Sequence, residues 1–260
     1  MDLIDDFKKF IKKESLIEPD EKLLLAVSGG PDSITMLDLF DRIRDDYNLD
    51  ISVFHLNHKF RQEADKEAEF VKNICNQKNI QVKIKEYNIP KLVEKKGYSP
   101  EEAARKIRLN LLIKEAEKNH IKKIVLGHNK DDLVETIFLH MFRGAGLNGL
   151  TGIDPVSYYK GVMLVHPLLN LSKNKIKKYC TLKNLNPRID PSNKQDKYTR
   201  NKIRLNIIPY IEEEINPAIK DNMYKMASIL REENNYLEKE SKKRAEEILI
   251  KKNKYEVILS

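Results

Sequence analysis

The feature that most constrains the fold is a regular alternation of short apolar stretches with longer amphipathic stretches. Each short stretch leads into a polar turn or a helical pattern, as a buried strand does. The pattern predicts strands at residues 23–27, 51–56, 80–89, 122–128 and 162–169. Because strands that alternate with helices form sheets covered by helices, we predict an α/β fold with a doubly wound, mostly parallel sheet.

The stretches between these strands carry apolar side chains at helical spacing. They predict helices at 33–46, 62–78 and 99–119, and another from about residue 172 to residue 184. Residues 143–152 contain four of the nine glycines, and this density predicts a mobile loop rather than a helix or a core strand.

The pattern changes near residue 188. Beyond it the chain is heavily charged, residues 225–252 match one long helix, and residues 254–260 look like the start of a strand. We therefore predict two domains, an α/β domain at 1–188 and a smaller all-helical domain at 189–260.

The composition indicates what kind of partner the protein binds and in which cellular compartment it is expected. A formal net charge of +8 and a pI near 9.1 favour a polyanionic partner. No apolar run approaches the ~20 residues that a membrane span needs, and the first residues lack the apolar core of a signal peptide, so we expect a cytoplasmic protein. Cys75 and Cys180 fit no zinc, iron–sulfur or disulfide spacing, and we expect both to be packing residues.

One turn carries clear chemical information. The first strand runs into SGGPDS at residues 28–33, and a helical pattern follows. A strand that ends in two glycines and feeds a helix presents backbone N–H groups and the positive end of the helix dipole, which together bind phosphate. The turn lacks the lysine of the GxxxxGK[ST] loop, and it is not the GxGxxG turn of dinucleotide-binding domains.

The turn resembles the SGGxDS signature of the PP-loop family, ATP pyrophosphatases that cleave ATP between its α and β phosphates and transfer AMP. The resemblance implies a Rossmann-like (HUP-like) sheet, ATP as a substrate, and Mg²⁺ held by the acid of the turn, Asp32. It also implies that His55 and Asn57, at the end of the second strand, lie beside the adenine. The residues expected to hold the phosphates are Ser28, Gly29, Gly30, Pro31, Asp32 and Ser33.

Further stretches resemble one branch of that family, the tRNA(Ile)-lysidine synthetases. They are GHNKDDLVETIFLHMFRGAGLNGLTGI at 127–153, EEAARKIR at 101–108, HPLL at 166–169, DPSN at 190–193 and RNKIR at 200–204. Members of that family join lysine to C2 of the wobble cytidine in an isoleucine tRNA with a CAU anticodon. They act through an adenylated tRNA and release AMP and pyrophosphate. The resemblance implies the same ligase activity, with lysine and that tRNA as substrates.

The spacing of His128, Asp132 and Glu135 places them on one face at the start of a helix. Such a cluster suits an incoming lysine, whose ammonium needs carboxylate partners and whose attacking amine must lose a proton. The same acids would also complement the dipole of their helix. Arg105 and Arg108 are expected to neutralise phosphate charge, with a solvated helix face as the alternative.

The resemblance also implies contacts with tRNA. We expect the glycine-rich segment to close over the substrates and exclude water. Without the resemblance, RNKIR and DPSN would be an ordinary helix cap and turn. The long C-terminal helix is interpreted first as a solvated face and second as a platform for a tRNA stem. The candidate tRNA-binding residues are Arg143, Asn193, Arg200, Asn201 and Arg204.

Two other functions stay open. A tRNA 2-thiolation enzyme of the same superfamily would need CxxC pairs for an iron–sulfur centre, which two isolated cysteines do not provide. A catalytically silent tRNA-binding module would not need an intact SGGPDS turn. The resemblance also implies that these residues are the N-terminal part of a longer chain, because the synthetases continue into further C-terminal domains. The oligomeric state is open, and a homodimer is one option.

Overall fold

The computed structural model forms two compact units. The first unit comprises Met1–Asp132 and Asp154–Lys194, and the second comprises Leu133–Ile153 and Gln195–Ser260. The second unit therefore includes an internal segment of the chain as well as its C-terminal part. The residues that the structure describes are 3–57, 64–87, 100–188, 199–252 and 257–259.

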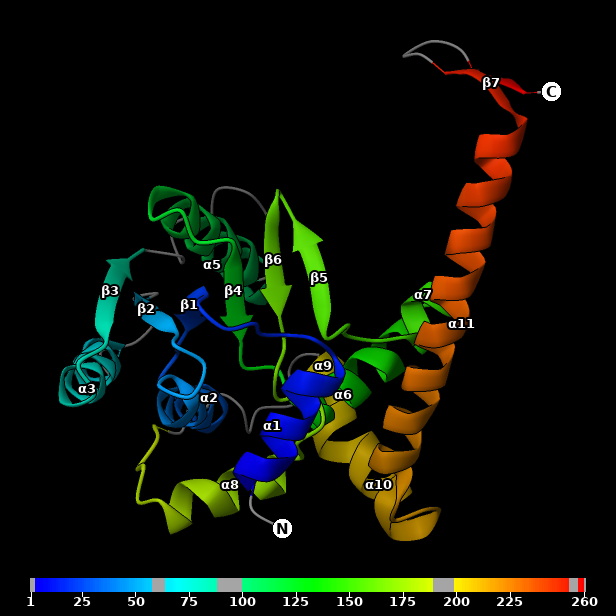
Figure 1. Ribbon diagram of the computed structural model, residues 1–260. Coiled ribbons are helices and arrows are strands. Elements are labelled where there is room, and N and C mark those ends of the chain that lie inside the picture. Colours follow the sequence, from blue (N-terminus) through cyan, green and yellow to red (C-terminus); the bar gives the residue numbers. More distant parts are fainter. Residues whose placement is uncertain (1–2, 58–63, 88–99, 189–198, 253–256, 260) are drawn as a thin grey trace. The chain divides into compact units, whose positions relative to one another are not determined.

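The first unit is built on a six-stranded sheet in the order β3-β2-β1-β4-β6-β5 (Figure 1). All neighbouring strands pair in parallel except β5 and β6. The predicted mostly parallel α/β sheet is confirmed, and each predicted strand is present with somewhat different bounds. The strands are β1 (Lys22–Ala26), β2 (Asp50–Asn57), β3 (Gln81–Glu86), β4 (Lys123–Leu126), β5 (Val156–Tyr159) and β6 (Val162–Val165).

The sequence-based prediction missed strand β5. It forms an antiparallel hairpin with β6, in which Tyr159 pairs with Val162 across a turn of Lys160 and Gly161. Both turn residues have positive φ, 49° and 80°. Two such residues make the type I′ turn that suits the twist of a hairpin. The Lys-Gly pair between VSYY and VMLV was the signal for this strand.

Helices cover both faces of the sheet, as the prediction required. Parallel crossovers are right-handed, so the connections from β1 to β2 and from β2 to β3 lie on one face, and the return from β3 to β4 lies on the other. The helices of the first unit are α1 (Leu3–Lys13), α2 (Pro31–Ile43), α3 (Ala64–Gln77), α5 (Pro100–Lys118) and α8 (Lys173–Leu182).

The core follows the alternation of side chains along the strands. Leu24 and Phe54 point to the face that α5 covers, where they pack with Leu112 in one buried cluster. Elsewhere in the unit, Phe7 of α1 packs edge-to-face on Phe40 of α2, with ring centroids 5.4 Å apart. Burying each such side chain contributes about 1.5–3 kcal/mol.

The strand order fixes where a ligand can bind. From β1 the chain moves outward through β2 to β3, and it then returns to the other side of β1 as β4. The order of the strands therefore reverses between β1 and β4. In open α/β sheets the crevice at the carboxyl ends of the strands at such a reversal is the ligand site.

The second unit is mainly helical (Figure 1). Helix α6 (Lys130–Met141) begins in the first unit, and its residues from Leu133 onward belong to the second. No described helix is long and apolar enough to cross a membrane. The other elements are α7 (Leu147–Leu150), α9 (Thr199–Lys202), the π-helix η2 (Ile203–Ile207), α10 (Ile208–Glu214), α11 (Ile219–Ile248), β7 (Leu249–Lys252) and β8 (Val257–Leu259).

Two predictions for these segments were wrong in part. The predicted loop at 143–152 contains one helical turn, α7, because the chain folds back on α6 there. The predicted long helix ends at Ile248, and residues 249–252 pair with β8 as an antiparallel hairpin instead. A strand near the end of the sequence is confirmed in β8.

Candidate active site

The turn after β1 sets a strand end against a helix N-terminus. Gly29 has a φ of +91°, in the left-handed region that favours glycine, and Pro31 is the first residue of α2. The N–H groups of Asp32 and Ser33 have no partner in the helical ladder, because the first turn of a helix has no preceding carbonyls. These donors and the helix dipole lie at the carboxyl end of β1, beside the point where the strand order reverses.

The hydroxyl of Ser33 fixes the shape of the turn. It accepts a hydrogen bond from the Ser28 backbone N–H at 3.1 Å and donates one to the Gly30 carbonyl at 3.1 Å. The two hydroxyl oxygens, Ser28 Oγ and Ser33 Oγ, are 3.1 Å apart. Ser33 is buried whereas Ser28 is exposed. Ser33 therefore shapes the turn, and Ser28 is the serine of the two that a ligand could reach.

The end of β4 comes very close to this turn. A Cβ added to Gly127 would lie 3.4 Å from both the Cα and the N of Ser33. Ordinary side chains rarely sit so close to backbone, so glycine lets β4 approach the start of α2. The sequence-based site list omitted Gly127, although it is the first residue of the GHNKDDLVE stretch.

Asn129 links the two strand ends, and it was also missed. Its side chain, nearly fully buried, donates from Nδ2 to Asp32 Oδ1 at 2.9 Å. Its Oδ1 accepts the Asp132 N–H at 3.1 Å, while Asp132 Oδ2 accepts the Asn129 N–H at 3.0 Å. This reciprocal pair caps α6. An Asn three residues before an Asp at a helix start was the signal in the sequence.

Lys173, the first residue of α8, reaches the turn from far along the chain. Its ammonium donates to Asp32 Oδ2, and its backbone N–H donates to Asp131 Oδ2 at 2.7 Å. The sequence analysis did not predict this contact. No local pattern marks it, because the two side chains are 141 positions apart.

Burial makes the Asp32 carboxylate dependent on a cation. Burial raises the pKa of Asp32, and the ammonium of Lys173 opposes that rise. The charge of Asp132 acts in the same direction as burial. A carboxylate in this setting is stabilised by any cation that can reach it.

His128 and Asp132, two of the three residues predicted to form one polar cluster, lie in the first unit, whereas Glu135 belongs to the second. Arg105 and Arg108, predicted to neutralise phosphate charge, also belong to the first unit. Burial and the neighbouring charge of Arg105 lower the pKa of Arg108, while Asp132 opposes them. Burial lowers the pKa of His166 to about 4, and the charges of Arg105 and Asp132 also act on it. The His128 and His166 rings lie 4.9 Å apart. His166, from the HPLL stretch, was absent from the predicted site residues.

The two residues expected beside adenine are buried. His55 Nδ1 lies 2.8 Å from the Val27 carbonyl, and burial lowers its pKa. Asn57 donates from Nδ2 to Asp65 Oδ1 at 2.6 Å. Both side chains are thus engaged within the protein at the end of β2.

In the second unit, Glu135 contacts two of the arginines predicted to bind tRNA. Its buried carboxylate accepts from Arg200 Nε at 2.9 Å, and from Arg204 Nε at 2.5 Å and Nη2 at 2.7 Å. Arg204 lies in the π-helix η2, a form that often occurs at functional sites. The predicted tRNA residue Asn201 is half-buried on α9, between these arginines in sequence, and Asn193 lies outside the described residues.

The glycine-rich segment is packed onto α6. His140 Nδ1 lies 2.7 Å from the Gly149 carbonyl, and Gly152 has a φ of +74°. A Cβ on Gly152 would lie 2.9 Å from Ile137 Cγ1, so any other residue would clash there and would also strain the backbone. Arg143 is exposed just after α6. The mobility of the segment stays a prediction.

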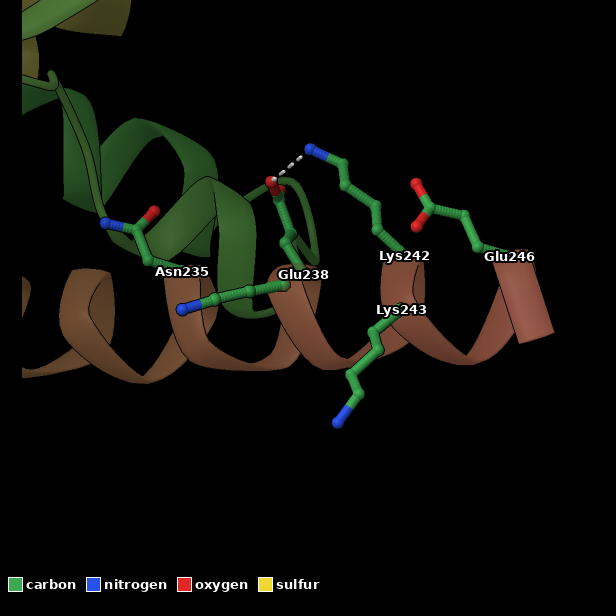
Figure 2. Close-up of a pocket in the computed structure, with 6 residues that line it drawn as sticks. Asn235, Glu238, Lys242, Lys243 and Glu246 are labelled. Carbon is green, nitrogen blue, oxygen red and sulfur yellow. Dashed lines mark ion pairs between the residues drawn. The ribbon is translucent and has the colours of Figure 1, made fainter.

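Helix α11 exposes a surface of mixed charge. Figure 2 shows lysines and glutamates side by side on it, and Lys242 Nζ lies 4.0 Å from Glu238 Oε2. The pocket drawn there is lined by Asn235, Lys243 and Glu246 among others. Because both signs of charge alternate, this face suits solvent better than a polyanion.

The described residues show no cluster of three or more histidine, cysteine or acidic side chains that could hold a metal ion. Cys75 and Cys180 are buried and unbridged, as expected for packing residues.

The chain resembles known proteins in sequence and in fold. A family model described as "PP-loop domain" matches residues 2–211. The tRNA(Ile)-lysidine synthase of Clostridioides difficile is 38% identical over 95% of this chain and 53% of its own length. That of Caldanaerobacter subterraneus subsp. tengcongensis is 42% identical over 91% of this chain and 50% of its own. The chain thus spans about half the length of the curated relatives it matches.

Among solved structures, the U34-tRNA thiolase NcsA of Methanococcus maripaludis has a TM-score of 0.70 with this chain. The two are 17% identical, and the match covers 88% of this chain and 78% of the thiolase. A likeness at this identity concerns the fold alone.

Proposed function

The chain belongs to the PP-loop domain family, and on this basis we propose that it is an ATP-dependent ligase that joins lysine to tRNA. The acceptor we propose is C2 of the wobble cytidine in an isoleucine tRNA with a CAU anticodon. The relatives named tRNA(Ile)-lysidine synthase support this choice. One observation carries it: an anion-binding turn and the acidic start of α6 meet at the β1/β4 reversal, joined by Asn129.

In the first step, the C2 oxygen of cytidine attacks the α-phosphorus of ATP, and pyrophosphate leaves. The backbone N–H groups of Gly29, Gly30, Asp32 and Ser33, together with the hydroxyl of Ser28, receive the departing pyrophosphate. Arg105 and Arg108 neutralise part of its charge, a role that suits the planar guanidinium group. Peptide groups at the end of β2 contact the adenine, because the side chains of His55 and Asn57 are engaged elsewhere.

A magnesium ion fits the oxygen atoms present at the turn. Asp32 offers a carboxylate, the charge of Asp132 is close enough to act on it, and Mg²⁺ is commonly held by one or two carboxylates together with substrate phosphates. When bound, the ion would neutralise charge on the phosphates. Asp32 is the residue that we propose holds it.

In the second step, the lysine amine attacks C2 of the adenylated cytidine, and AMP leaves. Asp132 binds the amine and fixes its direction of approach, and His128 is the candidate base for its proton. The contacts of Glu135 with Arg200 and Arg204 favour a supporting role for this acid, in which it holds the two arginines in place.

Binding of tRNA is assigned mainly to the second part of the chain. We propose that residues 1–188 carry catalysis and that residues 189–260 bind tRNA. The proposed contacts come from charged and amide side chains, which would reach phosphates around a splayed anticodon base. They are Arg143, Asn193, Arg200, Asn201 and Arg204.

A direct assay tests the proposal. The protein is incubated with ATP, labelled lysine and an isoleucine tRNA with a CAU anticodon, and the nucleosides of the digested tRNA are separated by mass spectrometry. We expect a lysine-bearing cytidine that depends on ATP. The matched substrate control is the same tRNA with uridine at the wobble position, which should take no lysine.

Two variants test the site residues in the same assay. Asp32→Ala and Asp132→Ala should each lower the rate by at least about 100-fold, the size of effect expected when a positioned catalytic group is lost. Lysine attached at the wild-type rate by either variant would contradict its assigned role. No lysine on the CAU tRNA with wild-type protein would refute the proposed function.

A further inference from the structure

The phosphate-binding turn has no lysine of its own, yet a lysine ammonium lies in it. Residues 28–33 read SGGPDS, and Nζ of Lys173 contacts Asp32 Oδ2. Asp32 is the second residue of α2, next to the N–H groups that face an anion. The ammonium is therefore only one carboxylate group away from the place where phosphates would bind.

The backbone around Lys173 is fixed. Its N–H donates to Asp131 Oδ2 at 2.7 Å, and the Lys130 N–H donates to the Leu171 carbonyl at 3.0 Å. The side chain of Ser172 caps α8. These bonds tie the start of α8 to the start of α6 and aim the lysine at the turn.

Helix stability does not explain a lysine at this position. A cation in the first turn of a helix opposes the helix dipole, at a cost of about 0.3–1 kcal/mol. The contact with Asp32 compensates for that cost, but an uncharged residue would avoid it. The helix itself thus gives no reason for a lysine here, and what distinguishes Lys173 from Lys175 of the same turn is that its ammonium contacts Asp32.

The ion pair is also open to a ligand. The side chain of Lys173 is 33% exposed to solvent, and that of Asp32 is 24% exposed. In the same unit, the ion pair of Lys78 and Asp38 is more buried, because these side chains are 21% and 4% exposed. Lys78 holds two helices together, whereas Lys173 keeps a side facing solvent at the crevice.

We propose that Lys173 is the phosphate-binding lysine of this turn, supplied by α8, and that its ammonium moves from Asp32 to the β- and γ-phosphates of ATP. The inference deepens the proposed function and rests on ATP binding at this turn. When the ammonium of Lys173 leaves Asp32 for the phosphate oxygens, the carboxylate of Asp32 becomes available to a magnesium ion. A single flexible side chain thus satisfies Asp32 before ATP arrives and the phosphates afterwards.

Binding measurements with two nucleotides test this proposal. ATP and AMP are each titrated calorimetrically, with Mg²⁺ and without tRNA or lysine, into wild-type protein, Lys173→Met and Lys173→Arg. We expect Lys173→Met to weaken ATP binding by about 10- to 100-fold, as for the loss of a charged hydrogen bond, and to leave AMP binding unchanged. Lys173→Arg should restore most of the affinity for ATP.

The matched control is Lys175→Met. Lys175 lies in the same first turn of α8, and its ion pair with Asp6, at 2.8 Å, points away from the turn. This variant should bind both nucleotides as the wild type does. Unchanged ATP affinity in Lys173→Met, or an equal loss for ATP and AMP, would overturn the proposal, since the second result indicates a structural role.

The outcome is separable from that of the lysine-attachment assay. A chain that needs Lys173 for ATP but modifies no tRNA would refute the proposed function and leave this inference standing. If the wild-type protein makes the modified cytidine and Lys173→Met binds ATP as tightly as the wild type, this inference alone would be refuted.

Discussion

Glu135, the buried acid of the second unit, should matter less for stability when it is removed than its two arginine partners do when they are removed together. The side chain of Glu135 is 2% exposed, while its partners Arg200 and Arg204 are 23% and 34% exposed. If both arginines become methionine, the carboxylate is left in the interior without a cation. If Glu135 becomes methionine, two cations remain that can turn towards water.

The magnitudes follow from that difference in exposure. Leaving a buried charge without its partner costs about 3–5 kcal/mol, which we expect for Arg200→Met with Arg204→Met. For Glu135→Met the remaining arginines are partly hydrated, so we expect about 1–2 kcal/mol. Methionine keeps an apolar stem of similar length, so packing changes little.

Urea unfolding followed by circular dichroism measures these free energies. The decisive sample is the triple variant, because it removes the stranded carboxylate from the double variant. We expect the triple variant to be more stable than the double by about 2 kcal/mol. A triple variant that is as unstable as the double, or less stable, would refute the argument. Glu238→Met on α11, where the ion pair is exposed, is the control and should change stability by less than about 0.5 kcal/mol.

Two further predictions concern pH and backbone geometry. Burial lowers the pKa of His166 from 6.5 to about 4, so the unfolded chain binds a proton that the folded chain excludes between these values. The free energy of unfolding in urea should fall by up to about 1.4 kcal/mol per pH unit as the pH drops through this window. His166→Asn should reduce that slope, whereas His120→Asn, at an exposed position, should leave it unchanged. In thermal unfolding, Gly152→Ala should cost about 2–4 kcal/mol, because its Cβ would meet Ile137 at 2.9 Å in a left-handed backbone. Gly161→Ala shares the positive φ but has open space, so about 1 kcal/mol is expected, and equal losses would contradict the clash.

Much of the site lies within short stretches of sequence, and those parts could be predicted. SGGPDS forms a turn between a strand and a helix because two glycines and a proline impose that geometry locally. His128 and Asp132 lie on either side of the start of α6. That start is also set locally, by the reciprocal hydrogen bonds between Asn129 and Asp132. The hairpin of β5 and β6 was equally local, and it was missed only because the Lys-Gly turn was overlooked.

The sequence by itself determined the alternating strands and helices, the glycine turn after β1 and the acidic start of α6, because each depends on neighbours within a few residues. Only the tertiary structure decided that β4 returns beside β1, so that Gly127 and Asn129 meet the turn. It alone paired Lys173 with Asp32, and Glu135 with arginines 65 and 69 positions away. The energy of such pairs depends on burial and on distance in space. Neither can be read from spacing along the chain.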